Sequence, residues 1–102
     1  MKVPAILSPA AQRDLLAAVH WINRDNPNAA HALHDAVIKA ARRIGEHAQV
    51  GVTRSDLVSD DFRFLVLTGF PYIIVYDAER RPPVIARILH AARDQPEVLR
   101  GL

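Results

Sequence analysis

Polar side chains end one of the most apolar stretches of the chain. The segment YIIVYDAERRPPVIARILHAARD, residues 72–94, contains two apolar runs around a charged turn and then reaches His90, Arg93 and Asp94. These side-chain types are found in catalytic sites, in partner-binding sites and at solvated chain ends. An ion pair of Arg93 with Asp94 or Asp77 is the simplest alternative to catalysis. We interpret the three residues as a rim that orders a sheet edge and faces a partner, not as a catalytic triad.

Metal and cofactor binding are not predicted. His31, His34 and Asp35 recur at helical spacing, but no fourth ligand follows at a defined distance in the sequence. The chain has no cysteine, which excludes thiolate ligands and disulfides. It also lacks a glycine-rich phosphate loop and a nucleophile elbow. His20 and His47 are isolated and are expected to be structural or exposed.

The composition is that of one soluble globular domain spanning residues 1–102. Half of the residues are apolar and 24% are charged, with a formal net charge of +2. The basic residues form no run, so the charge is only weak support for a nucleic-acid partner. The opening apolar run is broken by Pro4 and is too short for a signal peptide, and no stretch approaches the ~20 apolar residues of a membrane span. We therefore expect a cytoplasmic protein without membrane contact.

Hydrophobic periodicity predicts two helices after a short first strand, residues 3–7. Ser8 is suited to cap the first helix and Pro9 to begin it, and Asn26 and Pro27 repeat this pattern before the second. The first helix is expected to end before RDNPN, and the second near Gly45. The expected apolar stripes are Ala11, Leu15, Val19 and Ile22 in the first helix, and Ala30, Leu33, Val37, Ala41 and Ile44 in the second.

The second half of the chain changes to a strand pattern after a polar loop. Residues 62–67, 72–77 and 84–90 are short, β-branched and aromatic, and short turns separate them, which predicts an antiparallel meander. The fold class is therefore α+β. We expect an antiparallel sheet with an N-terminal helical hairpin packed on one face, in the order β-α-α-β-β-β.

Both faces of this sheet are predicted to be apolar. One hairpin covers only one face, so part of the second face needs another cover. The alternatives are a second copy of the chain, a segment of another protein, or the long loop and the C-terminal tail. We favour a protein partner because the tail is short. Arg63 is expected to pair with a carboxylate or to reach the sheet rim, and Arg87 to lie on the second face, where an ion pair is the simplest role.

The order of elements and several segments resemble the RelE/ParE superfamily of bacterial toxins from type II toxin–antitoxin systems. The similar segments are LSPAAQRDLLAAVHWI, NAAHALHDAVIKAARRI, FRFLVL and YIIVYD…VIARILHAARD. Together they cover nearly the whole chain. The ending, with Tyr76 closing its strand, is most similar to ParE-like members.

The resemblance implies one of two known activities. RelE-type members cut messenger RNA in the ribosome with two lysines, two arginines and a tyrosine, which activate the ribose hydroxyl and stabilise charge on the phosphate. In this chain the lysine positions fall near Phe64 and Val66, one arginine near Ile73 and the tyrosine near Leu99, while Arg93 alone matches. Losing such donors costs about 3–4 kcal/mol each. The resemblance therefore implies a ParE-like inhibitor of DNA gyrase, a protein-binding toxin rather than an enzyme.

The same resemblance implies a ParD-like antitoxin that wraps the helical hairpin and the sheet by helix-in-groove binding or strand addition. DNA would then be contacted only through the antitoxin or gyrase. The candidate antitoxin-binding residues are Trp21, Phe64, Val66, Ile73 and Arg87. The candidate residues for target binding or for the sheet rim are Arg63, Tyr76, His90, Arg93 and Asp94.

Three alternatives stay open at this point. Trp21 is either an interface anchor or a core residue. The chain could be a divergent ribosome-dependent ribonuclease that uses Arg93, His90 and Tyr76. It could also be an inactive family member whose only role is to form the complex.

Overall fold

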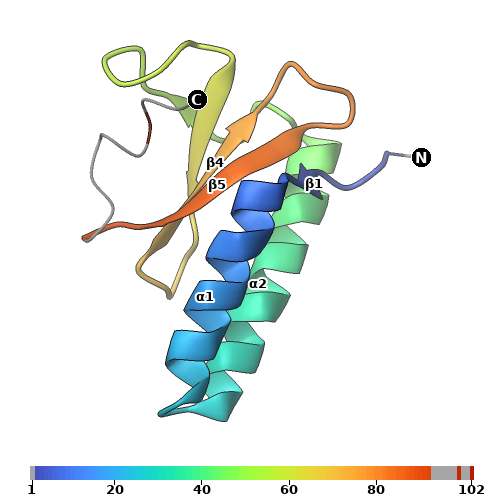
Figure 1. Ribbon diagram of the computed structural model, residues 1–102. Helices are drawn as coiled ribbons and strands as arrows, with labels where there is room; N and C mark the ends of the chain where they lie inside the picture. Colours follow the sequence, from blue (N-terminus) through green and yellow to red (C-terminus); the bar gives the residue numbers. More distant parts are fainter. Residues whose placement is uncertain (1, 93–98, 100–101) are drawn as a thin grey trace.

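The structure is a computed structural model that describes residues 2–92 together with Leu99 and Leu102, and it shows a helical hairpin against a sheet (Figure 1). The α+β class and the helical hairpin followed by strands are confirmed. In chain order the elements are β1 (Ile6–Leu7), α1 (Pro9–Asn23), α2 (Pro27–Glu46), β2 (Val52–Thr53), β3 (Phe62–Val66), β4 (Tyr72–Asp77) and β5 (Val84–His90).

Both helices begin where the sequence predicts. The side chain of Ser8 accepts a hydrogen bond from the N–H of Ala11, and that of Asn26 accepts one from the N–H of Ala29, each at 3.0 Å. Each residue thus satisfies a backbone donor that the first turn leaves without a helical partner. A proline follows each cap. Gly45 lies inside the last turn of α2 rather than beyond its end.

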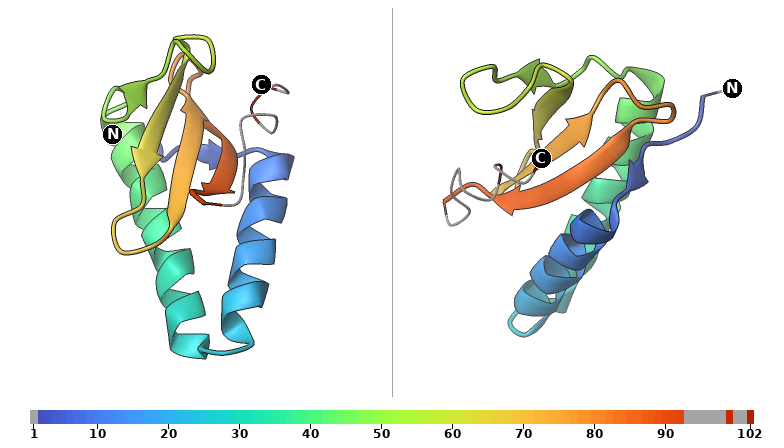
Figure 2. Two further views of the ribbon diagram at one scale, coloured as in Figure 1. Left: turned by 90° about the vertical axis from the view of Figure 1, so that its left-hand side faces the viewer. Right: turned by 45° about the horizontal axis from the view of Figure 1, so that its top comes forward.

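The predicted apolar stripes form the faces by which the helices pack on the sheet. All five stripe residues of α2 are buried, whereas in α1 Ala11 and Leu15 are buried and Val19 and Ile22 are half-buried. All of these stripe residues except Ala30 belong to or pack against one core that includes Ile74, Tyr76 and Ile85 of the sheet. Figure 2 shows both helices on the same side of the strands. Neither helix in the described part of the chain is both long and apolar enough to cross a membrane.

The sheet has five strands in the order β1-β5-β4-β3-β2. The meander of β3, β4 and β5 is antiparallel, as predicted, and places Val66 beside Ile73 and Tyr72 beside His90. The first strand is shorter than expected and pairs parallel to β5, with Ile6 beside Val84, so the sheet is mixed. β2 pairs with β3 from within the segment that was predicted to be a loop. Strands of two residues are too short to produce a detectable alternation.

The second face of the sheet is covered in part by the chain itself. Val75 and Leu89 form a small buried cluster with Leu99, and Val58 from the long loop packs against it. At the centre of this face the alternative cover, by the long loop and the C-terminal part of the chain, is therefore the one observed, because Val58 and Leu99 pack there. Val66 remains 66% exposed at the end of β3. Among the described residues, the end of this face around Val66 is therefore open to another molecule.

Candidate interaction surfaces

Trp21 lies on the surface at the end of α1, between two hollows. It is 58% exposed, and the guanidinium carbon of Arg24 lies 5.2 Å from the centre of its ring. Of the two roles left open by the sequence, the surface role fits this exposure. One hollow, of ≈ 340 Å³, separates Trp21 from Tyr72 and Ile88. The other, of ≈ 330 Å³, is lined by Trp21, Ile22, Pro71, Tyr72 and His90.

Tyr72 forms the floor that both hollows share. Its side chain is buried, with 4% exposed. The ring of His90 stands almost perpendicular to that of Tyr72, with an interplanar angle of 85° and a centre-to-centre distance of 5.3 Å. The His90 Nδ1 accepts a hydrogen bond from the N–H of Ala92 at 3.2 Å. His90 therefore lies at the rim of the sheet, as expected, and borders the Trp21 hollow on the helical side.

Arg87 is tied to helix α1 by Asp14. The Arg87 Nε and Nη2 donate to the two carboxylate oxygens of Asp14 at 2.7 and 2.9 Å, and the N–H of Ile88 donates to Asp14 Oδ2 at 2.9 Å. The expected ion pair is confirmed. Arg87 lies beside Val75 of the second face, as predicted, and its guanidinium reaches Asp14 in the helical layer. A bulge between Val75 and Tyr76 places Ile85 beside Tyr76, so Ile85 lies on the helical side and the strict alternation of β5 is broken.

Tyr76 holds the loop after α2 against the sheet. Its ring is fully buried; its hydroxyl donates to the carbonyl of Ala48 at 2.7 Å and accepts from the N–H of Gly51 at 2.9 Å. Burial raises the pKa of the Tyr76 phenol above its ordinary value. The hydrogen bond from Gly51 and the charges of Arg63 and Arg43 act to lower this pKa, but burial is the largest effect. The proposal that Tyr76 contacts a target is therefore wrong, since its polar group is enclosed by the chain's own backbone.

Arg63 supports the same loop from β3. Its Nη1 donates to the carbonyl of Gly51 at 2.8 Å and to that of Gln49 at 3.4 Å. The guanidinium thus reaches the sheet rim, one of the two expected roles, and bonds carbonyl oxygens rather than a carboxylate.

The apolar candidates on the second face differ in exposure. Phe64 is half-buried against the cluster of Val75 and Leu89, whereas Val66 is exposed, and Ile73 beside it is half-buried. Arg93 and Asp94 lie outside the described residues. The accessible candidates are therefore concentrated at one end of the sheet.

Two residues that shape these surfaces were not identified from the sequence. Asp14 carries the ion pair and the Ile88 hydrogen bond, yet it is a single carboxylate in an amphipathic helix, and its partner Arg87 is 73 residues away. Tyr72 was recognised only as part of a strand. Its position at the first residue of a predicted strand was the only sign in the sequence that it could form the floor of a surface hollow.

The three histidine and aspartate residues at helical spacing in α2 make only loose contacts. His31 Nε2 and His34 Nδ1 lie 3.8 and 3.9 Å from the carboxylate oxygens of Asp35, and all three side chains are exposed. Within residues 2–92 and the two other described positions, no group of three or more acidic, histidine or cysteine side chains is arranged to hold a metal ion.

Comparisons with known proteins agree with this architecture. The chain is 27% identical over 85 residues to the toxin RelE3 of Caulobacter vibrioides, covering 83% of this chain and 90% of that protein. Among solved structures, a chromosomal ParDE toxin–antitoxin system from P. aeruginosa has the same fold, with a TM-score of 0.70 at 20% identity. That alignment covers 87% of this chain and 96% of the other.

A family model decides the classification. The model of the ParE toxin of the type II toxin–antitoxin system parDE matches residues 5–95, which include the helical hairpin and the sheet from β1 to β5. The matched residues also include most of the segments that resemble RelE and ParE toxins. The chain therefore belongs to the ParE toxin family of type II toxin–antitoxin systems.

Proposed function

We propose that this toxin acts by binding and inhibiting DNA gyrase, without catalysis of its own, and that a ParD-like antitoxin neutralises it. One comparison supports the first part: the resemblance to RelE-type nucleases places three of their charged groups near Phe64, Val66 and Ile73 of this chain, which are apolar. These side chains lie on the second face of the sheet. They neither transfer a proton nor stabilise charge on a phosphate, so this face is suited to protein contact.

The enclosure of Tyr76 weakens the nuclease alternative further. That alternative needs a tyrosine hydroxyl near the RNA, but the hydroxyl of Tyr76 already bonds the backbone of Ala48 and Gly51. A phenol with a raised pKa and two backbone partners is a poor general base at neutral pH.

The proposed antitoxin surface runs around one end of the sheet. The hollow beside Trp21 is lined by Pro71, which precedes β4, and by Tyr72, the first residue of β4, and Ile73 follows directly. Ile73 lies beside the exposed Val66 on the second face. One extended or helical segment can thus bury Trp21 on the helical side and continue over Pro71 to Val66. Such wrapping combines apolar anchors with a short path over the strand ends.

The gyrase proposal is tested with purified toxin, gyrase, ATP and supercoiled plasmid. We expect DNA broken and covalently linked to gyrase to accumulate with the toxin, and to disappear when purified antitoxin is added. A parallel reaction contains translating ribosomes and messenger RNA instead of gyrase. The expected result there is intact RNA.

Other outcomes distinguish the remaining hypotheses. RNA cleavage without DNA breakage would replace the gyrase proposal with the ribonuclease. Absence of both effects, from toxin that still binds antitoxin, would identify a family member that only forms the complex. In either case the antitoxin surface is tested separately by binding.

A further inference from the structure

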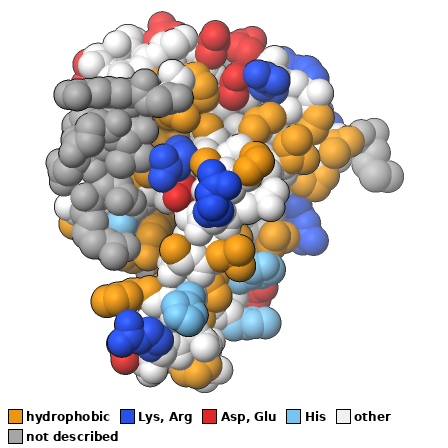
Figure 3. Space-filling model, in the orientation of Figure 1, with side chains coloured by type: hydrophobic (Ala, Val, Ile, Leu, Met, Phe, Trp, Pro, Cys, Tyr) orange, Lys and Arg blue, Asp and Glu red, His pale blue; other side chains and the backbone are white. Residues whose placement is uncertain are grey.

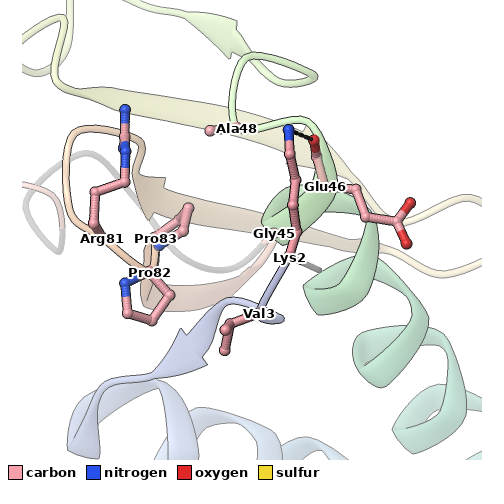
Figure 4. A pocket seen from close by; sticks show the side chains of 8 residues that line it. All are labelled: Lys2, Val3, Gly45, Glu46, Ala48, Arg81, Pro82 and Pro83. Atoms are coloured by element: carbon pink, nitrogen blue, oxygen red, sulfur yellow. Dashed lines mark hydrogen bonds between the residues drawn. The ribbon is translucent and has the colours of Figure 1, made fainter.

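We propose a second docking site, which binds an acidic peptide segment of a partner protein. An aliphatic side chain of this peptide inserts between the N-terminal segment (residues 2–6), the end of α2 and the turn from β4 to β5. The site is a pocket of ≈ 480 Å³. Figure 4 shows its lining side chains, which come from these three separate parts of the chain. The proposal does not depend on gyrase being the target.

The N-terminal segment is fixed at three points, so one wall of the pocket is built into the fold. The Lys2 Nζ donates to the carbonyl of Glu46 at 2.8 Å, the N–H of Ala5 to the carbonyl of Ala41 at 2.9 Å, and the N–H of Ile6 to that of Pro83 at 3.0 Å. These contacts join the segment both to α2 and to the start of β5.

Gly45 makes this close approach sterically feasible. A Cβ atom at this position would lie 2.2 Å from the carbonyl oxygen of Val3 and 2.7 Å from the Cα of Pro4. Both are backbone atoms that cannot rotate away, so only glycine permits the observed packing of the segment on α2.

The pocket has an apolar floor. Val3, Ala48, Pro82 and Pro83 contribute hydrocarbon surface from three sides. Val3 is 61% exposed, and Ile6 next to the pocket is 51% exposed. Figure 3 shows hydrophobic side chains gathered over the N-terminal segment and β1, with basic side chains above and below them. An aliphatic side chain placed here would remove several apolar groups from water.

The rim of the pocket is positively charged. Within the described part of the chain, Lys2 donates to the carbonyl of Glu46, and Arg81 donates to the carbonyls of Ala78 and Arg80, at 2.8 and 2.9 Å. Neither cation forms an ion pair with a carboxylate among the described residues. The carboxylate of Glu46 points away from the pocket, as Figure 4 shows. Two cations without carboxylate partners beside an apolar floor are complementary to an acidic segment.

The basic residues of α2 extend this charge. Lys39, Arg42 and Arg43 are exposed and share one side of the last turns of the helix, because residues three and four apart are neighbours. Asp35 lies one turn earlier, where it already has two histidine neighbours. An acidic segment that leaves the pocket toward α2 therefore continues along a cationic surface.

An acidic peptide fits this surface better than single-stranded nucleic acid or a second copy of the chain. Single-stranded nucleic acid needs aromatic platforms on which bases stack, and no aromatic side chain lines the pocket. A second copy of a chain with net charge +2 would bring further positive charge to a positive rim. A segment with carboxylates next to leucine, isoleucine or valine satisfies both the charge and the floor.

The site is separate from the proposed antitoxin surface. The pocket lies at the end of α2 and beside the start of the chain, whereas Trp21 lies at the other end of the hairpin, near the turn between the helices (Figure 1). A toxin bound by antitoxin around Trp21 thus keeps this pocket open to another protein segment.

The test follows backbone amide resonances of the full chain by NMR while peptide is added. The probe is an acetylated peptide of Glu-Glu-Leu repeats; a Lys-Lys-Leu peptide of equal length and a short single-stranded DNA are the comparisons. We expect the acidic peptide to shift the resonances of Val3, Gly45 and Ala48, and the lysine peptide and DNA to leave them in place.

Matched variants locate the interaction. The double variant Lys2→Glu/Arg81→Glu should weaken peptide binding about tenfold. Ala48→Leu, which fills the pocket and keeps every charge, should weaken it as well. Arg13→Glu, a reversal of an exposed charge on α1, should have no comparable effect. Far-ultraviolet circular dichroism and antitoxin binding verify that each variant is folded.

Several results would overturn the proposal. Equal shifts with DNA would indicate a nucleic-acid surface instead. An equal loss in Arg13→Glu, or unchanged binding in Ala48→Leu, would reduce the effect to non-specific charge attraction. A mass that doubles with concentration in light scattering, and falls to that of a monomer in the double variant, would identify a second copy as the occupant.

Discussion

At the residue scale, Tyr76 shows how one hydroxyl group secures a loop. It supplies a donor to Ala48 and an acceptor to Gly51, so two backbone groups depend on it. We predict that Tyr76→Phe lowers the free energy of unfolding by about 1–3 kcal/mol, because both groups lose a partner in a buried site. Urea denaturation measures this loss. Tyr72→Phe is the control, and an equal loss in it would contradict the specific role of the Tyr76 hydroxyl.

The raised pKa of Tyr76 makes its contribution depend on pH. The unfolded phenol loses its proton near the ordinary value of 10.0, whereas the folded phenol keeps its proton to higher pH. The unfolded state therefore binds fewer protons above that value, and the stability falls as pH rises. We predict that the stability difference between the wild type and Tyr76→Phe is constant below the unfolded pKa and shrinks above it. Thermal unfolding at increasing pH measures this difference, and a constant difference throughout would refute it.

Trp21 is the residue with which the antitoxin surface is tested. We predict that Trp21→Ala weakens antitoxin binding by about 2 kcal/mol, or about 30-fold in Kd, because a large aromatic anchor is lost. Leu16→Ala is the matched control, since Leu16 is 70% exposed on α1 but lies at a different angle around the helix. Calorimetry measures both. Similar losses in the two variants would argue against a localised anchor.

At the scale of elements, Asp14 joins α1 to β5 through three hydrogen bonds. Its carboxylate and the Arg87 guanidinium are largely shielded, with side chains 16% and 28% exposed. We predict that Asp14→Ala costs about 3 kcal/mol of stability. Arg87→Ala should cost less, because the N–H of Ile88 keeps its partner.

The exposed pair Arg54–Asp56 is the control for this ion pair. Its side chains are 48% and 63% exposed, so Arg54→Ala should change the stability only slightly. Chemical denaturation of the variants provides the comparison. A larger loss in Arg87→Ala than in Asp14→Ala would show that the bond to Ile88 does not contribute.

The helices could be predicted from the sequence because their signals are local. Ser8 and Asn26 cap them, and apolar residues repeat along each helix over several turns. The bulge in β5 could not be predicted, because it adds one residue without changing the apolar composition. The partner of Arg87 was also hidden, since only the folded chain brings Asp14 near it. The exposure of Trp21 was left open as well, because a position beside the apolar stripe is compatible with both a core and a surface role.

At the scale of the whole molecule, the proposed antitoxin path joins two faces at one end of the sheet. We predict that Val66→Ala and Trp21→Ala each weaken antitoxin binding, and that their free-energy changes add in the double variant, because separate contacts on one wrapped segment act independently. Calorimetry of antitoxin binding to the wild type, the two single variants and the double variant measures whether the changes add. A double variant no weaker than Trp21→Ala alone would place Val66 outside the path.

The topology also explains which parts of the fold escaped sequence-based prediction. The meander is sequential, so short turns revealed it, whereas β1 pairs with a strand nearly eighty residues later, which local patterns do not show. The cover of the second face likewise depends on Val58 and Leu99 meeting over Val75. Such contacts depend on the complete fold.

The parallel pairing of β1 with β5 has a consequence for synthesis of the toxin. Ile6 and Leu7 leave the ribosome early, but they cannot pair until Val84 and Ile85 have also emerged. Contacts between distant parts of a chain form late and slow its folding. The helical hairpin, being local, forms first and exposes its apolar stripe while translation continues. A nascent chain thus presents an unfinished sheet, and its apolar helical stripe stays accessible until the last strand has emerged.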